Sequence, residues 1–322
     1  MEWYVKSEDV SNPEYGEYPG SRSVEELLRK GVVVIDKPSG PTSHQVTAWV
    51  RDMLGLPKAG HSGTLDPRVT GVLVITLGEA TKMMPALIGL DKEYVGVMHL
   101  HKDVSPEKLE EARRRFEGEI IQKPPVKSSV KRVRRKRVIY SLEFLEREEK
   151  DVLFRVRCEA GTYIRKLCDD IGRYLGVGAH MHELRRIAAG PFTEEQAVIL
   201  QDLKDAYEFW KEGDESFIRE VVKPVEILSE HLGKIVVKDT AVNAICNGAP
   251  LAVGGISRVQ KGIKKGDLVA ILTLKGELVA LARAAMDSEE MYRSRKGMAA
   301  RTDRVMMERK MYPATWRSSH NL

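Results

Sequence analysis

Two spacings of apolar residues alternate along the first two thirds of the chain. Short apolar or alternating runs are typical of β-strands, and they predict strands at residues 32–35, 72–77, 92–101, 137–146, 151–159 and 180–188. Apolar positions three and four apart are typical of amphipathic helices, expected at residues 23–31, 43–54, 79–88, 105–116, 161–175 and, with a more polar surface, 200–221. Ser23 and Ser43 are the expected N-caps of the first two helices, with Glu26 completing a capping box.

The apolar pattern changes character around residues 222–233. Beyond this point the chain predicts a strand at 234–239, a short helix at 240–247, a hairpin of 266–272 with 277–284, and a last strand at 303–310. These elements form a β-rich unit of about 80 residues, an ordinary size for a small domain. Residues 1–20 are rich in Glu, Pro, Gly and Tyr, and we expect them to form an irregular arm.

Charge divides the chain more sharply than composition does. The 322 residues are 42% apolar and 31% charged, with a net charge of +5. Residues 113–137 carry eleven Lys or Arg against two Glu, and residues 291–317 carry eight against two acidic residues, whereas residues 1–30 are acidic. Two basic regions indicate either a polyanionic partner or two solvated charged faces, and charge alone does not decide between them.

Several functional classes are not supported by the sequence. The apolar runs are strand-sized, so no membrane span is expected, and the first residues lack a signal-peptide pattern. Cys158, Cys168 and Cys246 have no metal-binding spacing, and Cys158 and Cys168 are expected in the core, which favours a cytoplasmic protein. His180 and His182 lack a third ligand nearby in sequence, so we interpret them as strand residues and expect no metal site.

One loop carries the strongest candidate for chemistry. Residues 60–67 read Gly-His-Ser-Gly-Thr-Leu-Asp-Pro. Gly60 and Gly63 permit a close approach or a positive φ, and Pro67 biases Asp66 toward an extended conformation. These features fit either a reactive carboxylate on a bare loop or an ordinary Asp-Pro turn, and the octapeptide alone favours the turn.

Side chains at other strand and helix ends can complete a site around Asp66. An aspartate can act as a covalent nucleophile if it stays ionised in a desolvated cleft, and Arg165 is a candidate for the cation that pairs with it. Tyr94 and Tyr163 offer rings on which a base can stack, as an enzyme that flips a base out of folded RNA requires. His61 is either a support for such a nucleotide or an ordinary loop histidine.

At these residues the chain resembles the TruB-type pseudouridine synthases. The similar segments are the catalytic motif at 60–67 with Gly71 and 78–82, the N-terminal motif at 36–44, the arginine motif at 161–167, and the last motif at 183–186 with 190–192. Four motifs in the right order across residues 31–192 leave little room for chance. The C-terminal unit is similar, more weakly, to a PUA domain, which is an RNA-binding module.

The resemblance implies an α+β fold, with a mixed, mainly antiparallel sheet flanked by helices and a C-terminal β-rich PUA-like barrel. It implies a tRNA or rRNA pseudouridine synthase that isomerises uridine with no cofactor and no metal. The resemblance implies that Asp66 is the nucleophile and that Arg165 is its partner. Tyr94 then stacks on the target base, and Tyr163 and Leu184 line its pocket. His61 supports the flipped nucleotide.

The basic stretch 127–137 is predicted to be a surface loop, because it has seven Lys or Arg among eleven residues and no apolar period. Its expected RNA-binding residues are Lys127, Lys131, Arg132, Arg134, Arg135, Lys136 and Arg137.

The acidic arm, residues 124–128 and the PUA-like unit make the chain most similar to the archaeal, dyskerin-like branch of the family. That similarity implies a ribonucleoprotein with a box H/ACA guide RNA and small partner proteins. The expected divisions are an arm at 1–30 packed on the C-terminal domain, a catalytic domain at 31–228 and a PUA domain at 234–312. A standalone tRNA-modifying enzyme and a non-catalytic RNA scaffold remain alternatives.

Overall fold

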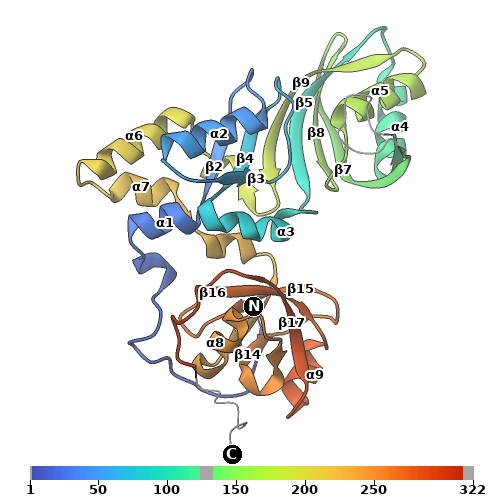
Figure 1. The fold of residues 1–322 in the computed structure, drawn as a ribbon. Coiled ribbons are helices and arrows are strands. Elements are labelled where there is room, and N and C mark those ends of the chain that lie inside the picture. The colour runs from blue at the N-terminus through green and yellow to red at the C-terminus, as the bar shows by residue number, and fades with distance from the viewer. Residues whose placement is uncertain (1, 124–132, 315–322) are drawn as a thin grey trace, which may run out of the picture.

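The computed structural model describes residues 2–123 and 133–314. Figure 1 shows these residues as two bodies, one above the other, with a ten-stranded sheet in the upper body and a seven-stranded sheet in the lower one. Helices pack on the upper sheet, and most strand pairs in both sheets are antiparallel. The predicted α+β class, with a mixed and mainly antiparallel sheet, is confirmed.

The larger sheet has the strand order β11–β2–β4–β9–β5–β8–β7–β6, with β3 beside β4 and β10 beside β9. β4 and β9 pair in parallel, and this is the junction between its two halves. The strand bounds are β2 (Gly31–Lys37), β3 (Ala59–His61), β4 (Thr70–Leu77), β5 (Lys92–Leu100), β6 (Gly118–Gln122), β7 (Arg135–Glu148), β8 (Asp151–Cys158), β9 (Ala179–Ala189), β10 (Phe192–Thr193) and β11 (Lys223–Pro224).

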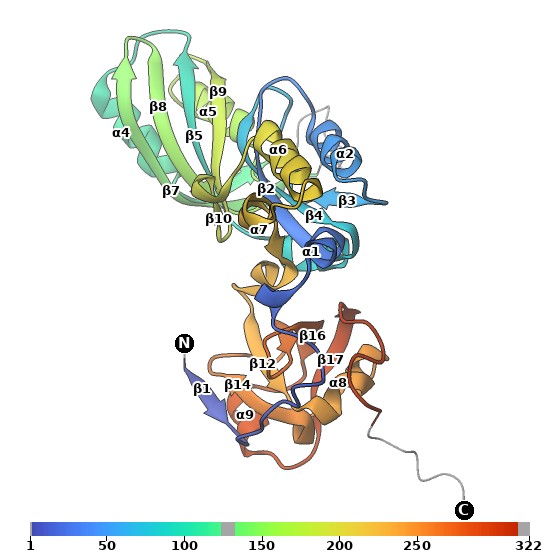
Figure 2. The same ribbon diagram turned by 90° about the vertical axis from the view of Figure 1, so that its left-hand side faces the viewer.

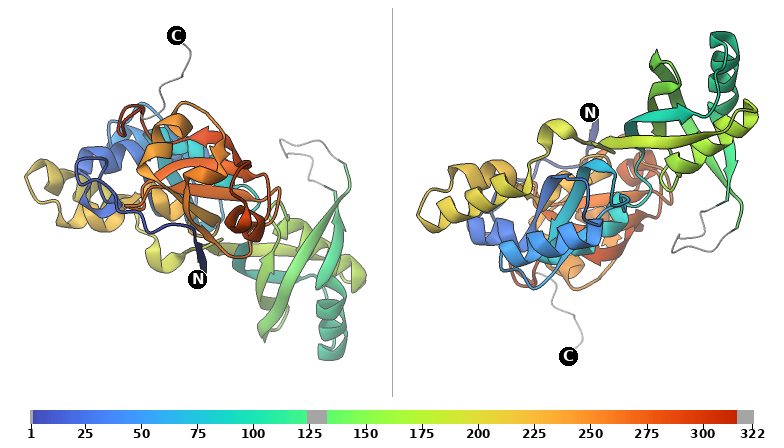
Figure 3. Two further views of the ribbon diagram at one scale, coloured as in Figure 1. Left: turned by 90° about the horizontal axis from the view of Figure 1, so that it is seen from below. Right: turned by 90° about the horizontal axis from the view of Figure 1, so that it is seen from above.

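Separate groups of helices bury the two halves of this sheet. The half with β2 and β4 packs one face on α1, α2, α6 and α7, and the half with β5, β7 and β8 packs on α4 and α5. Viewed along the long axis, the second half extends beyond the outline of the lower body (Figure 3). The helix bounds are α1 (Val24–Lys30), α2 (Ser43–Met53), α3 (Met84–Leu87), α4 (Pro106–Phe116), α5 (Ile164–Tyr174), α6 (Leu200–Lys211) and α7 (Ser216–Val221), with the 3-10 helices η1 (Pro19–Ser21), η2 (Gly78–Met83), η3 (Glu194–Gln196) and η4 (Val225–Ser229).

The smaller sheet has the order β1–β14–β12–β15–β16–β17–β13 and encloses its own apolar core. Only β12 and β15 pair in parallel among its described strands. The bounds are β1 (Trp3–Val5), β12 (Gly233–Val237), β13 (Leu251–Ala252), β14 (Ile256–Gln260), β15 (Leu268–Leu272), β16 (Leu278–Ala284) and β17 (Met298–Val305), with α8 (Asp239–Cys246), α9 (Ser288–Arg293) and η5 (Val253–Gly255).

The N-terminal segment lies against the lower body. Residues Trp3–Val5 form β1, which pairs antiparallel with β14 at the sheet edge (Figure 2). Further along, the Lys275 ammonium donates to the carbonyls of Tyr15 (2.6 Å) and Gly16 (3.1 Å). The prediction of an arm without regular structure is therefore wrong for β1, because the edge of the smaller sheet supplies backbone partners that the sequence does not reveal.

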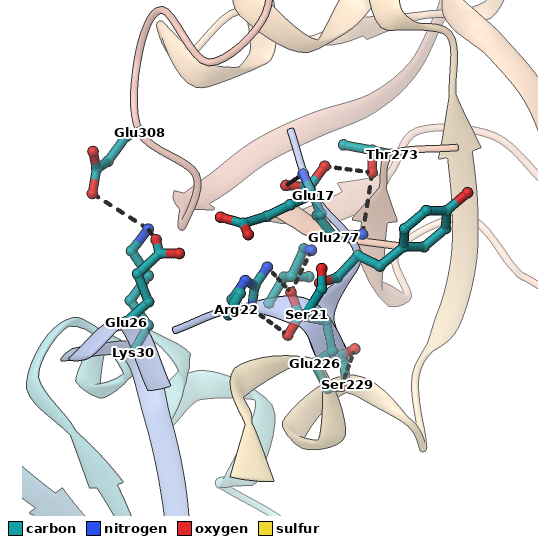
Figure 4. A network of polar contacts seen from close by, with 12 residues as sticks. Glu17, Ser21, Arg22, Glu26, Lys30, Glu226, Ser229, Thr273, Glu277 and Glu308 are labelled. Carbon is teal, nitrogen blue, oxygen red and sulfur yellow. Dashed lines mark hydrogen bonds and ion pairs between the residues drawn. The ribbon is translucent and has the colours of Figure 1, made fainter. Parts of the chain in front are cut away.

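The two bodies share an apolar cluster and a polar network. Val34 and Val74 of the larger sheet lie in one buried cluster with Leu281 and Met306 of the smaller unit. Beside this cluster, Arg22 donates two hydrogen bonds of 2.8 Å to the carboxylate of Glu226 (Figure 4). The apolar cluster crosses the boundary, and the Glu226 carboxylate also accepts a hydrogen bond from the Leu278 N–H of the smaller unit (2.9 Å), which indicates a fixed junction.

The same network extends to the buried carboxylate of Glu277. It accepts hydrogen bonds from the Tyr312 hydroxyl (2.7 Å), the Thr273 hydroxyl (3.1 Å) and the backbone N–H of Glu17 (3.1 Å). Figure 4 shows the side chains of Glu277 and Thr273 beside Glu17 of the N-terminal segment. The segment before α1 is therefore held between the two bodies.

Several predicted elements differ at their ends. The expected helix 79–88 divides into the 3-10 helix η2 and the short α3. The last strand is β17 (Met298–Val305) and not residues 303–310, because it pairs with β16 from Ala300 to Val305. Residues 135–137 belong to β7 and not to a loop, because they pair with residues 120–122 of β6. The last two differences come from strand pairing, which overrides local pattern.

Candidate active site

The loop that carries Asp66 lies between β3 and β4 and is held by the start of α2. The Ser43 hydroxyl accepts a hydrogen bond from the Leu65 N–H (2.8 Å) and donates one to the Leu65 carbonyl (3.2 Å). The prediction that Ser43 caps this helix is therefore wrong. Thr42 is the N-cap, in a reciprocal capping box with Gln45, and this frees Ser43 to fix the loop.

Lys37 fixes the other side of the same loop. Its fully buried ammonium donates to the carbonyls of Pro38 (2.8 Å), Pro67 (3.0 Å) and Val69 (2.9 Å). Burial, and then the charge of Arg186, lowers the pKa of Lys37. With three carbonyls bound, this lysine uses all of its donors to shape the turn that follows Asp66.

Asp66 and Arg165 meet across the site. Arg165 lies on the first turn of α5, and its guanidinium forms an ion pair with the Asp66 carboxylate. The predicted pairing is present in the structure. The predicted desolvation is absent, because the Asp66 side chain is 50% exposed and that of Arg165 is 54% exposed. The pair faces solvent and is accessible to a bulky substrate.

The expected aromatic and apolar lining lies beside this pair. Tyr94, on β5, is 8% exposed and packs in one cluster with Leu65 and Val69 of the Asp66 loop and with Leu184 of β9. Burial raises the pKa of the Tyr94 hydroxyl. The structure thus brings Tyr94 and Leu184 to the Asp66 loop, with little of the tyrosine ring exposed.

Tyr163 is positioned by a residue that the sequence reasoning missed. The buried Gln122 side chain accepts from the Tyr163 N–H (2.9 Å) and donates to the Tyr163 carbonyl (3.1 Å). Gln122 ends β6, so this contact joins the start of α5 to the point where the basic segment leaves the sheet. In the sequence, Gln122 is one polar residue at the end of a strand. Its burial, which marks it as a positioning residue, cannot be predicted from that pattern.

His61 lies at the end of β3 with its ring edge-on to His44, the ring centroids 4.8 Å apart. Its Nδ1 is buried and has no hydrogen-bond partner among the described atoms. Burial, followed by the charges of His44 and Arg186, lowers the pKa of His61 to about 4. His61 is therefore a neutral imidazole near pH 7, which removes it as a cationic contact for phosphate.

The predicted RNA-binding residues divide into three groups. Lys127, Lys131 and Arg132 lie outside the described residues. Arg134 and Arg135 are exposed at the start of β7. Lys136 and Arg137 already contact carboxylates, Glu119 at 3.0 Å and Glu159 at 3.6 Å.

The histidines dismissed as a ligand pair have more neighbours than the sequence indicated. His101 Nε2 lies 3.0 Å from His180 Nδ1, and His99 packs beside both rings. Strand pairing of β5 with β9 creates this cluster. In the part of the chain that the structure describes, no group of three or more His, Cys, Asp or Glu side chains is arranged to hold a metal ion. Those residues also include no helix long and apolar enough to cross a membrane.

Comparison with protein families gives matches over most of the chain. The profile described as TruB family pseudouridylate synthase (N terminal domain) matches residues 51–164, and tRNA pseudouridylate synthase B C-terminal domain matches residues 165–229. A PUA domain matches residues 233–306, and a DKCLD domain matches residues 1–47.

Named relatives are similar along almost their whole length. A probable tRNA pseudouridine synthase B of Archaeoglobus fulgidus is 56% identical over 318 residues, covering 98% of each chain. Its namesake in Methanosarcina barkeri is 57% identical over 312 residues, covering 97% of this chain and 92% of the relative.

Two solved structures match equally closely. A Cbf5-Nop10-Gar1 complex contains a chain 52% identical, with a TM-score of 0.92 and coverage of 97% of this chain and 96% of that one. An H/ACA RNP bound to a substrate RNA containing 2′-deoxyuridine contains a chain 50% identical, also with a TM-score of 0.92, covering 98% and 97%.

Proposed function

Since the chain belongs to the TruB family of pseudouridylate synthases, we propose that it isomerises uridine to pseudouridine at a site built around Asp66, in RNA presented by a box H/ACA guide RNA. The pairing of Asp66 with Arg165, from two motifs 99 residues apart, is the observation that carries this proposal. The guide RNA and small partner proteins are supported by the similar chains found in a Cbf5-Nop10-Gar1 complex and in an H/ACA RNP.

The reaction moves one bond and needs no oxidant. The N1–C1′ bond of uridine breaks, a C5–C1′ bond forms, C5 loses its proton and N1 gains one. Asp66 starts this sequence as an ionised carboxylate, by attack on C1′, by addition to the base or by removal of a sugar proton. Arg165 holds the carboxylate in its charged form by pairing with it.

The remaining site residues bind the flipped nucleotide. Tyr94 stacks on the target base through its exposed edge, and Tyr163 and Leu184 line the pocket. His61, being neutral, supports the nucleotide by packing. Binding of the base covers the half-exposed Asp66, so the RNA itself supplies the desolvation that the free protein lacks.

The test replaces one atom of the carboxylate. Asp66→Asn, in the full chain assembled with guide RNA and partner proteins, is expected to lower tritium release from [5-³H]uridine RNA by at least about 1000-fold. RNA affinity should stay within about threefold, because phosphate contacts dominate binding. Asp52→Asn is the matched control, since Asp52 is also an exposed aspartate paired with an arginine. Full activity of Asp66→Asn refutes the assignment of Asp66, whereas no tritium release by the wild-type complex supports the scaffold alternative.

The tRNA alternative rests on a different observation, the name tRNA pseudouridine synthase B that similar proteins carry. The same assay decides between the two, using tRNA with and without guide RNA. Guide-dependent product on the target RNA supports the guided reaction. Product on tRNA from the protein alone supports the standalone enzyme.

The basic segment between β6 and β7 contacts the RNA backbone in this proposal. The described strand ends support this: β6 ends at Gln122, whose side chain contacts Tyr163, and β7 begins at Arg135, which pairs with Gln122. Arg134→Gln with Arg135→Gln is expected to reduce the slope of log affinity against log salt by about 1 to 2. Lys204→Gln with Lys211→Gln on α6 removes the same charge and should leave the slope unchanged. If both double variants show the same slope, Arg134 and Arg135 belong to a solvated charged face and do not contact RNA.

The proposed division of the chain is an N-terminal arm at 1–30, a catalytic domain at 31–228 and a PUA domain at 234–312. The two sheets and the contacts of β1 with β14 support it. The proposed location is the cytoplasm, where an archaeal ribonucleoprotein meets its RNA substrates.

A further inference from the structure

Besides Lys37, whose ammonium is bound to three carbonyls, two further buried cations near the Asp66 loop have no carboxylate partner. Arg186 is 1% exposed and Lys92 is 8% exposed. Among the described residues, neither side chain forms an ion pair with Asp or Glu. The carboxylate next to Lys92 in sequence, Asp91, is bound instead to Arg157 at 2.8 Å. Buried charges are ordinarily paired, so two unpaired ones at a single place require an explanation.

Both cations lie directly under the Asp66 loop. A Cβ atom on Gly63 would lie 3.5 Å from Arg186 Nη1 and 3.5 Å from Lys92 Cε, so both side chains lie next to the space that a side chain at Gly63 would fill. The positive φ of +85° at Gly63 lets the loop follow this path. The part of the loop that precedes Asp66 therefore lies against these two cations.

Arg186 joins three elements of the site. Its Nε donates to the Val72 carbonyl of β4 (2.7 Å), and its Nη2 donates to the Gly63 carbonyl (3.1 Å). The charge of Arg186 also acts on the Tyr94 hydroxyl of β5 and lowers its pKa, against the larger raising effect of burial. Lys92 makes one hydrogen bond, to the Leu90 carbonyl at 2.6 Å, and projects under Gly63. Arg186 is thus a rigid clamp, whereas Lys92 contributes charge with fewer bonds.

We propose that Lys92 and Arg186 form a cationic floor under the site, which stabilises the negative charge that moves from Asp66 to the uracil during the reaction. This inference rests on the proposed function. In each of the three routes open to Asp66 the carboxylate loses its negative charge, and the base gains one when its bond to C1′ breaks or when C6 is attacked. Fixed positive charge in a buried place needs no reorganisation as this charge moves. Both residues act from beneath the loop at Gly63, so they are positioning residues.

The charge of Lys92 depends on pH within an accessible range. Burial, and then the charge of Arg186, lowers the pKa of Lys92 to about 8, while Cys158 of β8 and Asp91 act in the opposite direction. A guanidinium side chain, by contrast, is not deprotonated in proteins. As pH rises through about 8, the floor therefore loses one of its two charges, and the rate should fall.

The test is the pH profile of single-turnover pseudouridine formation by the assembled complex at saturating RNA. The wild-type rate should fall above pH 8. Lys92→Arg keeps its charge, and its alkaline fall should move up by at least about one pH unit. Lys92→Met should be slower by about tenfold at pH 7 and insensitive to pH around 8. The control is Lys204→Met, which replaces an exposed lysine on α6. It should keep the pH profile of the wild type.

The outcomes separate this inference from the proposed function. An alkaline fall at the same pH in wild type and in Lys92→Met comes from another group and overturns the floor. If Lys92→Arg folds poorly, Lys92→Met, which matches the length and apolar stem of lysine, decides alone, with its melting temperature and RNA affinity as checks. A wild-type complex that forms no pseudouridine refutes the proposed function itself. If the wild-type complex is active, Asp66→Asn abolishes the activity and Lys92→Met leaves it unchanged, only the cationic floor is refuted.

Discussion

Two arginine–carboxylate pairs lie in different regions of the molecule and are built in opposite ways. At the site, Arg165 and Asp66 are each about half exposed. At the junction of the two bodies, Arg22 and Glu226 are largely buried, and two parallel hydrogen bonds join them. A pair that must open for a substrate has to remain exchangeable with water, whereas a pair that fixes two domains gains from burial and full bonding.

The comparison predicts that Arg165 matters for rate and hardly for stability. Arg165→Met is expected to reduce single-turnover pseudouridine formation by about 100- to 1000-fold, because the carboxylate loses its fixed partner. The free energy of unfolding should change by less than about 1 kcal/mol, since the pair is exposed to solvent. Arg165→Lys is the control, because it keeps the charge and should recover part of the rate. A loss of several kcal/mol in urea unfolding would contradict the contrast.

Arg22 should show the reverse behaviour. Arg22→Met leaves the Glu226 carboxylate buried with the Leu278 N–H (2.9 Å) as its remaining donor, and is expected to cost about 3 kcal/mol of stability. Pairing it with Glu226→Gln should restore part of that loss, because the buried charge is gone. Folded Arg22→Met should retain the wild-type rate at temperatures below its transition. A rate loss without a stability loss would place Arg22 with the site and not with the junction.

A smaller effect is expected where the N-terminal segment passes the junction. Gly16 has a φ of +58°, and a Cβ there would lie 2.3 Å from the buried Glu277 carboxylate. Gly16→Ala should therefore lower stability by about 1 to 3 kcal/mol. Gly20→Ala is the matched control, because nothing lies within 4 Å of its Cβ position. Chemical denaturation of the two variants, compared side by side, measures the difference, and equal stabilities would refute it.

The smallest effect concerns the polar group that the site leaves unbonded. Because the pKa of His61 is lowered to about 4, the folded protein binds fewer protons than the unfolded chain between pH 6.5 and 4. Stability should therefore fall as pH is lowered through this range and be unaffected by His61 above it. His61→Phe should weaken the fall between pH 7 and pH 4.5 in denaturant midpoints. An identical fall in the variant would show that other groups cause it.

Much of the fold could be predicted because its elements carry strong local signals. The alternating residues Val152, Phe154, Val156 and Cys158 predicted one buried face of a strand, and all four are buried in β8. The basic segment shows the limit of such signals. Arg135 to Arg137 have no apolar period, yet they form a strand because β6 offers backbone partners.

The candidate site divides in the same way. The sequence motifs, through their resemblance to a family, identified six site residues: Asp66, Arg165, Tyr94, Tyr163, Leu184 and His61. Ser43, Gln122, Lys92 and Arg186 position those residues, and the sequence did not distinguish their tasks. A serine before a helix is ordinarily a cap, and the hydroxyl of Ser43 acquires its role only when the Leu65 backbone lies beside it.

By itself, the sequence determined which residue types are available and which of them lie on turns, strand ends and helix ends, because these depend on neighbours along the chain. The tertiary structure alone decided burial, and burial decides the charge chemistry. It left Asp66 half exposed, made His61 a neutral imidazole, and enclosed Lys92 and Arg186 without a carboxylate. Desolvation depends on everything packed around a group, which is why no local pattern foretells it.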